Sequence, residues 1–194
     1  MKLDGKVAIV TGSGQGVGRG IGLALAAEGA RVVLMSRTAS RVEAVASEIH
    51  DRGGEALAIT GDVTRPRDIE STLSTTLETY ERLDILVNNA QHIPRGRILE
   101  TSDEEAQAAW ESGPLATLRF MRSAHPHLKG GGVIINVGSR AGLRPDPVGM
   151  GAYAAAKEAI RALSRTAAME WGQDGIRVLV ILPFATSAHL QRME

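Results

Sequence analysis

The sequence predicts a doubly wound α/β fold, in which one parallel sheet carries helices on both faces. Short β-branched runs recur along the chain, longer segments with helical spacing separate them, and a glycine-rich turn follows the first run. Parallel strands are buried on both faces, so they show near-continuous apolar runs rather than alternation. The expected strands are residues 7–10, 32–35, 56–60, 85–88, 133–137 and 178–182.

Length and composition indicate one globular domain over residues 1–194. Hydrophobic residues make up 43% of the 194 and charged residues 23%, which excludes a disordered chain and leaves no room for a second full domain. Lysine plus arginine and aspartate plus glutamate each number 22, so no excess charge attracts nucleic acid or an anionic membrane.

The chain contains no cysteine, which excludes disulfides, thiolate zinc sites and thiol nucleophiles. The first residues lack the basic and long apolar regions of an export signal, and the apolar runs are too short to span a bilayer. We therefore expect a soluble, cytoplasmic protein.

Local signals agree with alternating strands and helices. Ser40 with Glu43, and Ser102 with Glu105, have the spacing of a capping box, in which side chains bond the free amides at a helix start. Glycines that follow helical stretches are expected to close the last turn in a left-handed conformation. They are Gly29, Gly53, Gly54, Gly130 and Gly172.

A glycine-rich turn, TGSGQGVG at residues 11–18, follows the first expected strand and opens a helix. Glycines let the backbone turn tightly and approach a pyrophosphate, whose charge then lies on the free amides of the helix N-terminus. The same pattern also occurs in flexible turns, but its place between a strand and a helix favours nucleotide binding. The predicted cofactor contacts here are Gly12, Ser13, Gln15, Gly16, Val17 and Gly18.

The end of the second expected strand bears on the choice of cofactor. Ser36 and Arg37 stand where an acid would accept hydrogen bonds from the adenosine ribose, whereas a guanidinium pairs with a 2′-phosphate. Arg37 therefore favours NADP(H) over NAD(H). The alternative is a solvated arginine that opens the next helix.

Two further strand ends carry polar residues at the same edge of the sheet. Asp62 and Val63 are placed to meet the adenine, although an aspartate after a glycine is also common as a turn or cap residue. Asn89 and Ala90 either support the cofactor or belong to a loop whose residues bond one another. Their place at the carboxyl ends of the strands favours cofactor support.

The candidate catalytic residues are Ser139, Tyr153 and Lys157. Ser139 follows the fifth expected strand, and the spacing of four between Tyr153 and Lys157 puts the phenol and the ammonium on one helix face. A nearby cation lowers the pKa of a tyrosine, so the phenol can exchange a proton near neutral pH. The alternative is a packed tyrosine and a solvated lysine, which the strand-end serine and the glycine-rich turn disfavour.

Together, TGxxxGxG, NNA, the serine and YxxxK resemble the short-chain dehydrogenase/reductase family from the first strand to about Pro183. The resemblance implies a Rossmann fold and a nicotinamide-dependent oxidoreductase that interconverts a small carbonyl and an alcohol. It implies that Tyr153 exchanges the proton, that Ser139 orients the substrate oxygen, and that Lys157 binds the nicotinamide ribose and tunes Tyr153. It also implies a homodimer or homotetramer; the alanines after Tyr153 permit close packing, either between subunits or on their own sheet.

The sequence departs from this family in the helix before the fifth strand. The family usually has an asparagine there that supports a water chain to the lysine, and the matching residue is Gly113, followed by Pro114. Pro114 is expected to kink or interrupt the helix. We expect either that backbone carbonyls hold the waters of this chain in place of the asparagine, or that the enzymatic activity is lower than is usual in the family.

The loop after the fourth strand departs as well. Gln91 replaces a glycine of the family pattern, and is expected to narrow the nicotinamide pocket or to bond the substrate. His92 is interpreted as a solvated loop histidine rather than a substitute acid. His125 and His127 have metal-like spacing, but no third ligand is evident, so no metal site is predicted.

The C-terminal part carries the last departures. Pro183 and Thr186 are expected near the nicotinamide carboxamide, with Phe184 in place of the family's glycine. The family's substrate lid and final strand are expected to be missing from residues 1–194, so the substrate is not predicted. These departures motivate a second hypothesis, a nucleotide-binding pseudoenzyme or oligomer-forming scaffold.

Overall fold

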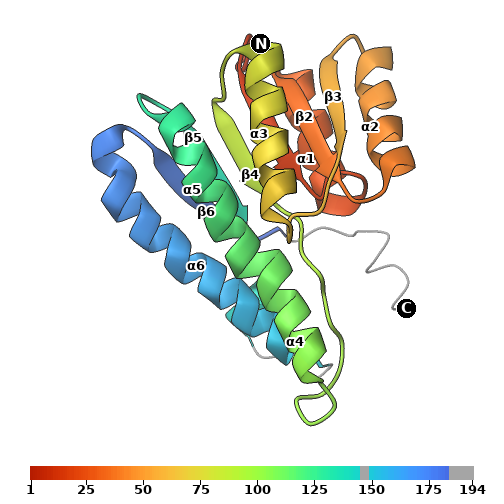
Figure 1. Ribbon diagram of the computed structural model, residues 1–194, viewed down its shortest axis with the longest axis vertical. Helices are drawn as coiled ribbons and strands as arrows, with labels where there is room; N and C mark the ends of the chain where they lie inside the picture. The colour runs from red at the N-terminus through yellow and green to blue at the C-terminus, as the bar shows by residue number, and fades with distance from the viewer. Residues whose placement is uncertain (145–148, 184–194) are drawn as a thin grey trace.

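The computed structural model describes residues 1–144 and 149–183. Within them, six parallel strands form one sheet in the order β3-β2-β1-β4-β5-β6 (Figure 1). The strands are β1 (Val7–Thr11), β2 (Arg31–Ser36), β3 (Glu55–Thr60), β4 (Ile85–Asn88), β5 (Val133–Val137) and β6 (Arg177–Ile181). The predicted doubly wound α/β sheet is confirmed, and each expected strand lies within one or two residues of an observed one.

Within the described ranges, six α-helices and three short helical turns connect the strands. The helices are α1 (Gly16–Ala27), α2 (Ala39–Asp51), α3 (Pro66–Tyr80), α4 (Asp103–Trp110), α5 (Ala116–Leu128) and α6 (Gly151–Trp171). A π-helical turn, η1 (Glu111–Leu115), joins α4 to α5, and 3₁₀ turns η2 (Arg140–Gly142) and η3 (Gly172–Asp174) flank α6. Of these described helices, none is long and apolar enough to cross a membrane.

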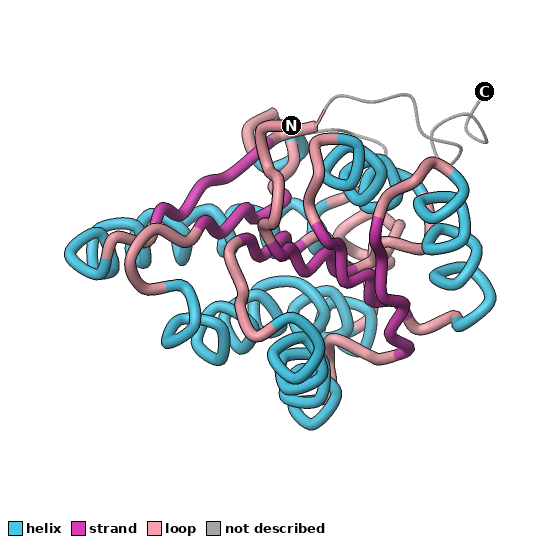
Figure 2. Tube along the Cα trace, turned by 90° about the horizontal axis from the view of Figure 1, so that it is seen from above, coloured by secondary structure: helices cyan, strands magenta, loops and turns pink. Residues whose placement is uncertain are grey.

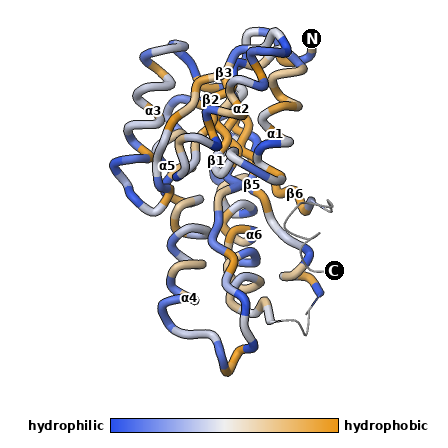
Figure 3. Tube along the Cα trace, turned by 90° about the vertical axis from the view of Figure 1, so that its right-hand side faces the viewer, coloured by the Kyte–Doolittle hydropathy of each residue, from blue (hydrophilic) through white to orange (hydrophobic). Residues whose placement is uncertain are grey.

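The sheet separates two apolar cores, as Figure 2 shows with the strands between two layers of helices. One core packs Val42, Val45 and Ile49 of α2, with residues of α1, mainly on one face of β1, β2 and β4. The other packs α3, α5 and α6 on the opposite face, with Phe120 and Met121 fully buried. Figure 3 accordingly shows the hydrophobic colour concentrated on the strands.

The strand order reverses between β1 and β4, which pair in parallel. In a doubly wound sheet, the ligand crevice opens at the carboxyl ends of the strands where the order reverses. The turn after β1 and the loop after β4 therefore form the two walls of the expected cofactor crevice. Strand β5 pairs with β4 through Asn88 and Asn136, whose side chains share a 2.8 Å hydrogen bond.

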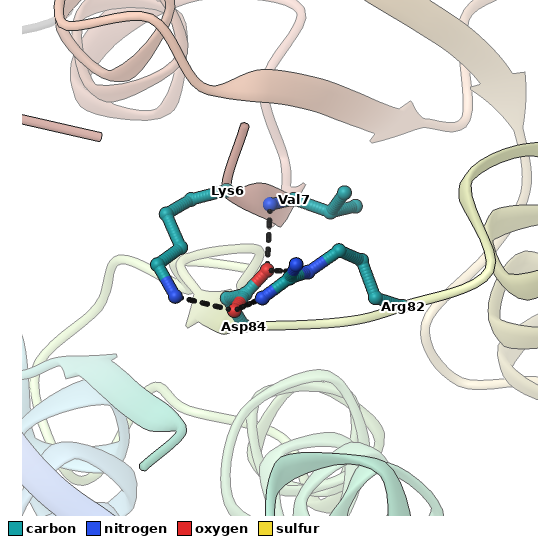
Figure 4. A network of polar contacts seen from close by, with 4 residues as sticks. All are labelled: Lys6, Val7, Arg82 and Asp84. Carbon is teal, nitrogen blue, oxygen red and sulfur yellow. Dashed lines mark hydrogen bonds and ion pairs between the residues drawn. The ribbon is translucent and has the colours of Figure 1, made fainter. Parts of the chain in front are cut away.

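An ion network ties the opposite ends of β1 and β4 together (Figure 4). The Asp84 carboxylate accepts hydrogen bonds from the Val7 amide at 3.0 Å, from Lys6 at 3.0 Å, and from two Arg82 nitrogens at 2.8 and 2.7 Å. Burial alone would raise the pKa of Asp84, but these donors outweigh it and lower the pKa to about 2. The network fixes the register of the two strands that wall the crevice.

The helix boundaries confirm some of the predicted caps and correct others. Ser102 caps α4, because its hydroxyl accepts from the Glu105 amide at 3.2 Å. The predicted box at Ser40 is wrong, since α2 begins one residue earlier and its N-cap is Thr38, which makes no side-chain cap bond. Gly54 and Gly172 are not left-handed either. After α6, η3 continues the chain, and Gly175 takes the positive φ of 74°.

The helix before β5 is interrupted as Pro114 predicts. Pro114 lies inside η1, and this turn is buried between α4 and α5. A proline has no N–H to donate to the preceding turn, so a wider π turn replaces the α-helical one. The same turn contacts α6, which carries Tyr153 and Lys157.

Candidate active site

The turn after β1 leaves the N-terminus of α1 open. The N-cap Gln15 makes no side-chain cap bond, and no acidic residue lies in the first turn. Gly16 has a φ of +55°, and no atom lies within 4 Å of where its Cβ would be. Free amides beside open space suit an anion, so the turn fits a dinucleotide pyrophosphate.

Gly12 and Gly18 serve a second purpose, which is close packing. A Cβ on Gly12 would lie 2.8 Å from Ala90 Cα, and a Cβ on Gly18 would meet the Gly12 carbonyl and lie 2.5 Å from Asn89 Nδ2. Only glycine permits this approach of the turn, helix α1 and the loop after β4.

Asn89 holds the turn in place from β4. Its Nδ2 donates to the carbonyls of Thr11 at 2.9 Å and Gly12 at 3.2 Å. The Thr11 hydroxyl in turn accepts from the amides of Asn89 and Ala90 at 3.0 and 3.1 Å. The two residues therefore support the glycine-rich turn from the protein side.

Other predicted contacts lie on different sides of the turn. Ser13 is fully buried, and its hydroxyl donates to the Met35 carbonyl of β2 at 3.4 Å. Val17 is half-buried at the start of α1. The Gln15 side chain accepts from Arg41 of α2 at 2.8 Å, a basic partner that the sequence did not single out.

Arg37 lies at the rim of a pocket of about 330 Å³ at the ends of β2 and β3. Arg65, Asp62 and Asp68 line the same pocket. Ser36, beside Arg37, bonds locally, because its hydroxyl donates to the Thr38 carbonyl at 3.1 Å. The pocket brings two guanidinium groups to the ends of β2 and β3. Arg65 was missed because it reads as the residue before the first turn of α3.

The Asp62 carboxylate bonds its own loop. It accepts from the Thr64 amide and hydroxyl, both at 2.9 Å, which is the turn geometry weighed as the alternative for this residue. Val63 is buried in the core that α3 covers. Asp62 still borders the pocket, so a contact to the adenosine end stays a prediction.

Ser139 and Tyr153 come together at the carboxyl end of β5. The Ser139 side chain makes a hydrogen bond to the Tyr153 phenol and also accepts from the Ala141 amide at 3.2 Å. Tyr153 lies in the first turn of α6, so the helix delivers its ring to the residue that leaves β5.

Lys157 lies one turn further along α6 and is only 4% exposed. Its Nζ donates to the Val137 carbonyl at 2.5 Å and lies 5.6 Å from the centre of the Tyr153 ring. Burial lowers the pKa of Lys157 to about 7. The lysine is therefore not solvated, and among the residues that the structure describes it forms no ion pair with a carboxylate.

The expected lowering of the Tyr153 pKa is wrong for this state of the site. Burial raises the pKa of Tyr153, and the hydrogen bond from Ser139 offsets only part of that increase. An ammonium favours a phenolate only while it is charged, and Lys157 loses its proton near neutral pH. The phenol is therefore held in its protonated form.

Gln91 takes a different position from the one expected. Its side-chain amide points against η1, where a Cβ on Gly113 would lie 2.8 Å from Gln91 Nε2. Both polar atoms of this amide are buried and lack a hydrogen-bond partner among the described residues. The next residue, His92, is anchored to η1, because its amide donates to the Ser112 hydroxyl at 2.9 Å.

The remaining predicted residues lie away from the reacting groups or outside the described ranges. His125 bonds Asp174 at 2.8 Å and packs on Trp171 at 4.8 Å between ring centres, which accounts for it structurally. Pro183 is described just after β6, whereas Phe184 and Thr186 lie outside the described residues. A larger pocket of about 590 Å³ borders Gly151, Ala154 and Glu158 on another side of α6 from Lys157.

A doubly wound sheet with an open anion site at α1 and a serine, tyrosine and lysine at the same edge defines a dinucleotide-dependent oxidoreductase. Comparison with known proteins agrees: a profile described as short chain dehydrogenase matches residues 6–194. The chain belongs to this family, whose members transfer a hydride to or from a nicotinamide cofactor. The comparisons favour this function over the scaffold hypothesis.

Relatives in the family have varied activities. The chain is 40% identical over 202 residues to a 12alpha-hydroxysteroid dehydrogenase from a Clostridium species, an alignment that covers 98% of this chain and 77% of that protein. It is 32% identical over 184 residues to a 3-oxoacyl-[acyl-carrier-protein] reductase from a Synechocystis species, covering 93% and 74%.

A solved structure has the same fold. The short chain dehydrogenase from Burkholderia cenocepacia in complex with NADP superimposes with a TM-score of 0.92 at 32% identity. The match covers 97% of this chain and 78% of that one. The crevice built here from the turn after β1 and the loop after β4 therefore belongs to a fold that binds this type of cofactor.

Proposed function

We propose that the protein is an NADP(H)-preferring carbonyl reductase or alcohol dehydrogenase that acts on a small molecule. The observation that carries this proposal is the contact of Ser139 with Tyr153 beside buried Lys157 at the edge of the crevice. Ser139, Tyr153 and Lys157 are its catalytic residues. Gly12, Gly16 and Gly18 form the pyrophosphate site.

A bound nicotinamide supplies or accepts the hydride. In reduction, Ser139 donates a hydrogen bond to the carbonyl oxygen, and Tyr153 gives this oxygen its proton as negative charge develops there. A phenol whose pKa is raised stays protonated at neutral pH and is ready for this step.

The preference for NADP(H) rests on the pocket that Arg37 and Arg65 border. A 2′-phosphate adds two negative charges to the adenosine end, and guanidinium groups bind phosphate oxygens in a bidentate manner. The proposal includes a cytoplasmic location and a homodimer or homotetramer.

The experiment is a panel of ketones, aldehydes and secondary alcohols assayed with NADPH and NADH by nicotinamide absorbance. We expect turnover with NADPH that falls at least about a hundredfold in Tyr153→Phe, because general acid catalysis contributes about that much or more. Tyr80→Phe is the matched control, since Tyr80 is the only other tyrosine and lies in the core. NADPH binding without turnover of any substrate contradicts the proposal.

A further inference from the structure

A cavity of about 590 Å³ lies apart from the catalytic residues. It is bordered by the loop before α4, by η2 and by the first two turns of α6, and Figure 1 shows this loop and the start of α6 at the same end of the molecule. Ser139, Tyr153 and Lys157 are not among its lining residues. Small-molecule sites have volumes of about 300–1,000 Å³, so the cavity is large enough for a ligand of its own.

The walls of the cavity are held together without a ligand. The Gly96 amide donates to the Gly149 carbonyl at 3.0 Å, and a Cβ on Gly149 would lie 2.7 Å from the carbonyl carbon of Gly96. A Cβ on Gly142 of η2 would lie 2.7 Å from Cγ of Glu158 on α6. These close approaches fix the loop and η2 against α6, so binding does not have to order the walls first.

One wall of the cavity is apolar and exposed. Ile98 is 81% exposed, although isoleucine is among the residues that are most often buried. It lies against the start of α6, where a Cβ on Gly151 would be 3.1 Å from Ile98 Cγ1. Met150 and Ala154 continue the apolar lining. A ligand that covers this wall removes apolar surface from water, so the wall favours an apolar body.

The charged groups of the cavity leave one positive charge without a counterpart. The carboxylate of Glu158 accepts from Nε and Nη2 of Arg161 at 2.9 and 2.6 Å, so its charge is balanced. Arg97 reaches Glu100 through its backbone amide, and its guanidinium forms no ion pair with any carboxylate in the described part of the chain. This guanidinium supplies a fork of N–H donors that matches a carboxylate.

We propose that the cavity is a further ligand site, which takes an amphipathic carboxylate. The apolar body of the ligand lies against Ile98, Met150 and Ala154, and its carboxylate accepts hydrogen bonds from the Arg97 guanidinium. Both parts are required, because an exposed arginine alone is a weak anion site and the apolar wall alone has no preference for charge. None of the three catalytic residues lines the cavity, so the site is independent of the proposed function.

Decanoate is the test ligand, and its binding is measured by calorimetry without cofactor, below the concentration at which it forms micelles. We expect one site per chain, and Arg97→Gln should weaken binding at least about tenfold because it removes the charge-assisted hydrogen bonds. Arg67→Gln is the matched control and should bind decanoate as the wild type does, since the Arg67 side chain is 80% exposed and outside the cavity. An absence of saturable binding, or an equal loss in both variants, would overturn the proposal.

The neutral alcohol 1-decanol separates the two parts of the site. It keeps the apolar body of decanoate and lacks the charge, so the wild type and Arg97→Gln should bind it with equal affinity. A loss of 1-decanol affinity in Arg97→Gln would mean that the substitution disturbs the apolar wall, and would remove the role of Arg97 as the carboxylate partner.

A second pair of variants tests whether decanoate binds in this cavity. Ala155 lines the cavity and Ala162 lies outside it, and both are exposed on α6. Leucine is nearly as good a helix former as alanine, so Ala155→Leu and Ala162→Leu should both keep the wild-type melting temperature. Ala155→Leu fills part of the cavity and should weaken decanoate binding at least about tenfold, whereas Ala162→Leu should not. Wild-type affinity in both variants would place the ligand elsewhere and contradict the proposal.

Sedimentation equilibrium tests the alternative occupant, which is a second copy of this chain. The oligomeric state should be the same with and without decanoate. A wild type that is oligomeric and binds no decanoate, with an Ala155→Leu variant that dissociates, would assign the cavity to a subunit interface and overturn the proposal. A protein that binds decanoate and reduces no carbonyl loses the proposed function and keeps this site, whereas the reverse result keeps the function and loses the site.

Discussion

Lys157 donates from Nζ to the carbonyl oxygen of Val137 at 2.5 Å, which joins helix α6 to the end of strand β5. This bond places the ammonium in the interior beside the Tyr153 ring. One acceptor does not replace the water that an ammonium loses on burial, and the pKa of Lys157 falls to about 7. The resulting sensitivity to pH is directly measurable.

We expect the ligand-free protein to become more stable as pH rises above about 7, as far as Lys157 is concerned. The unfolded lysine, with a pKa of 10.5, binds a proton that the folded one has lost, so the free energy of unfolding increases with pH in this window. Urea unfolding from about pH 7 to about pH 9.5 should show this slope in the wild type and a smaller one in Lys157→Met. Equal slopes would mean that the folded lysine stays charged.

Arg37 and Arg65 should determine the preference for NADP(H). Arg37→Ala or Arg65→Ala removes a guanidinium at the pocket, so the Kd for NADPH should rise at least about tenfold while that for NADH changes little. Arg67→Ala is the control, because Arg67 lies in the first turn of α3, close to Arg65, with its side chain 80% exposed. A similar loss in all three variants would indicate net charge rather than direct contact.

Helix α1 should tolerate alanine in place of one of its glycines and not in place of another. Gly18→Ala puts a methyl group against the Gly12 carbonyl and Asn89, so it should lower stability and weaken cofactor binding. Gly20→Ala faces open space in the same helix and should raise stability by about 0.5–1 kcal/mol. Thermal melts and calorimetric titration with NADPH measure both effects.

Asp84 should contribute to stability at neutral pH and lose that contribution in acid. Its pKa is about 2 when folded and 3.8 in the reference state, so the stabilisation is present above about pH 4 and disappears as pH falls toward 2. Asp84→Asn should cost about 2 kcal/mol at neutral pH and flatten the acid limb.

The exposed Asp51 at the end of α2 provides the control for Asp84. Asp51→Asn should leave the free energy of unfolding within about 0.5 kcal/mol of the wild type at every pH. Asp84→Asn with wild-type stability would show that the network in Figure 4 is only a surface ion pair.

The positions of the strands along the chain could be predicted from the sequence, because the signal for a buried strand lies within the strand itself. Residues 85–88 and 133–137 match β4 and β5 in full, since buried parallel strands need unbroken apolar runs. The serine cap of α4 could also be predicted, because it depends only on residues three positions apart. Ser40 misled because a serine one residue inside a helix has the same spacing as a cap.

Features that depend on distant segments were not readable. The raised pKa of Tyr153 comes from burial by the fold, which spacing along α6 does not reveal. Gly113 and Gln91 were each noted as departures, but only the structure shows that they meet, 22 positions apart in sequence. Their opposite changes in size, a side chain lost at one site and gained at the other, were the available signal.

The meeting of Gln91 and Gly113 restricts the order in which such a pair can change during evolution. Adding a side chain at 113 first creates a steric overlap, whereas shortening residue 91 first leaves a cavity that water can fill. Viable intermediates therefore pass through glycine at both positions. Each residue sets which substitutions its neighbour tolerates, so sequences of this family should show the two sites varying as a pair.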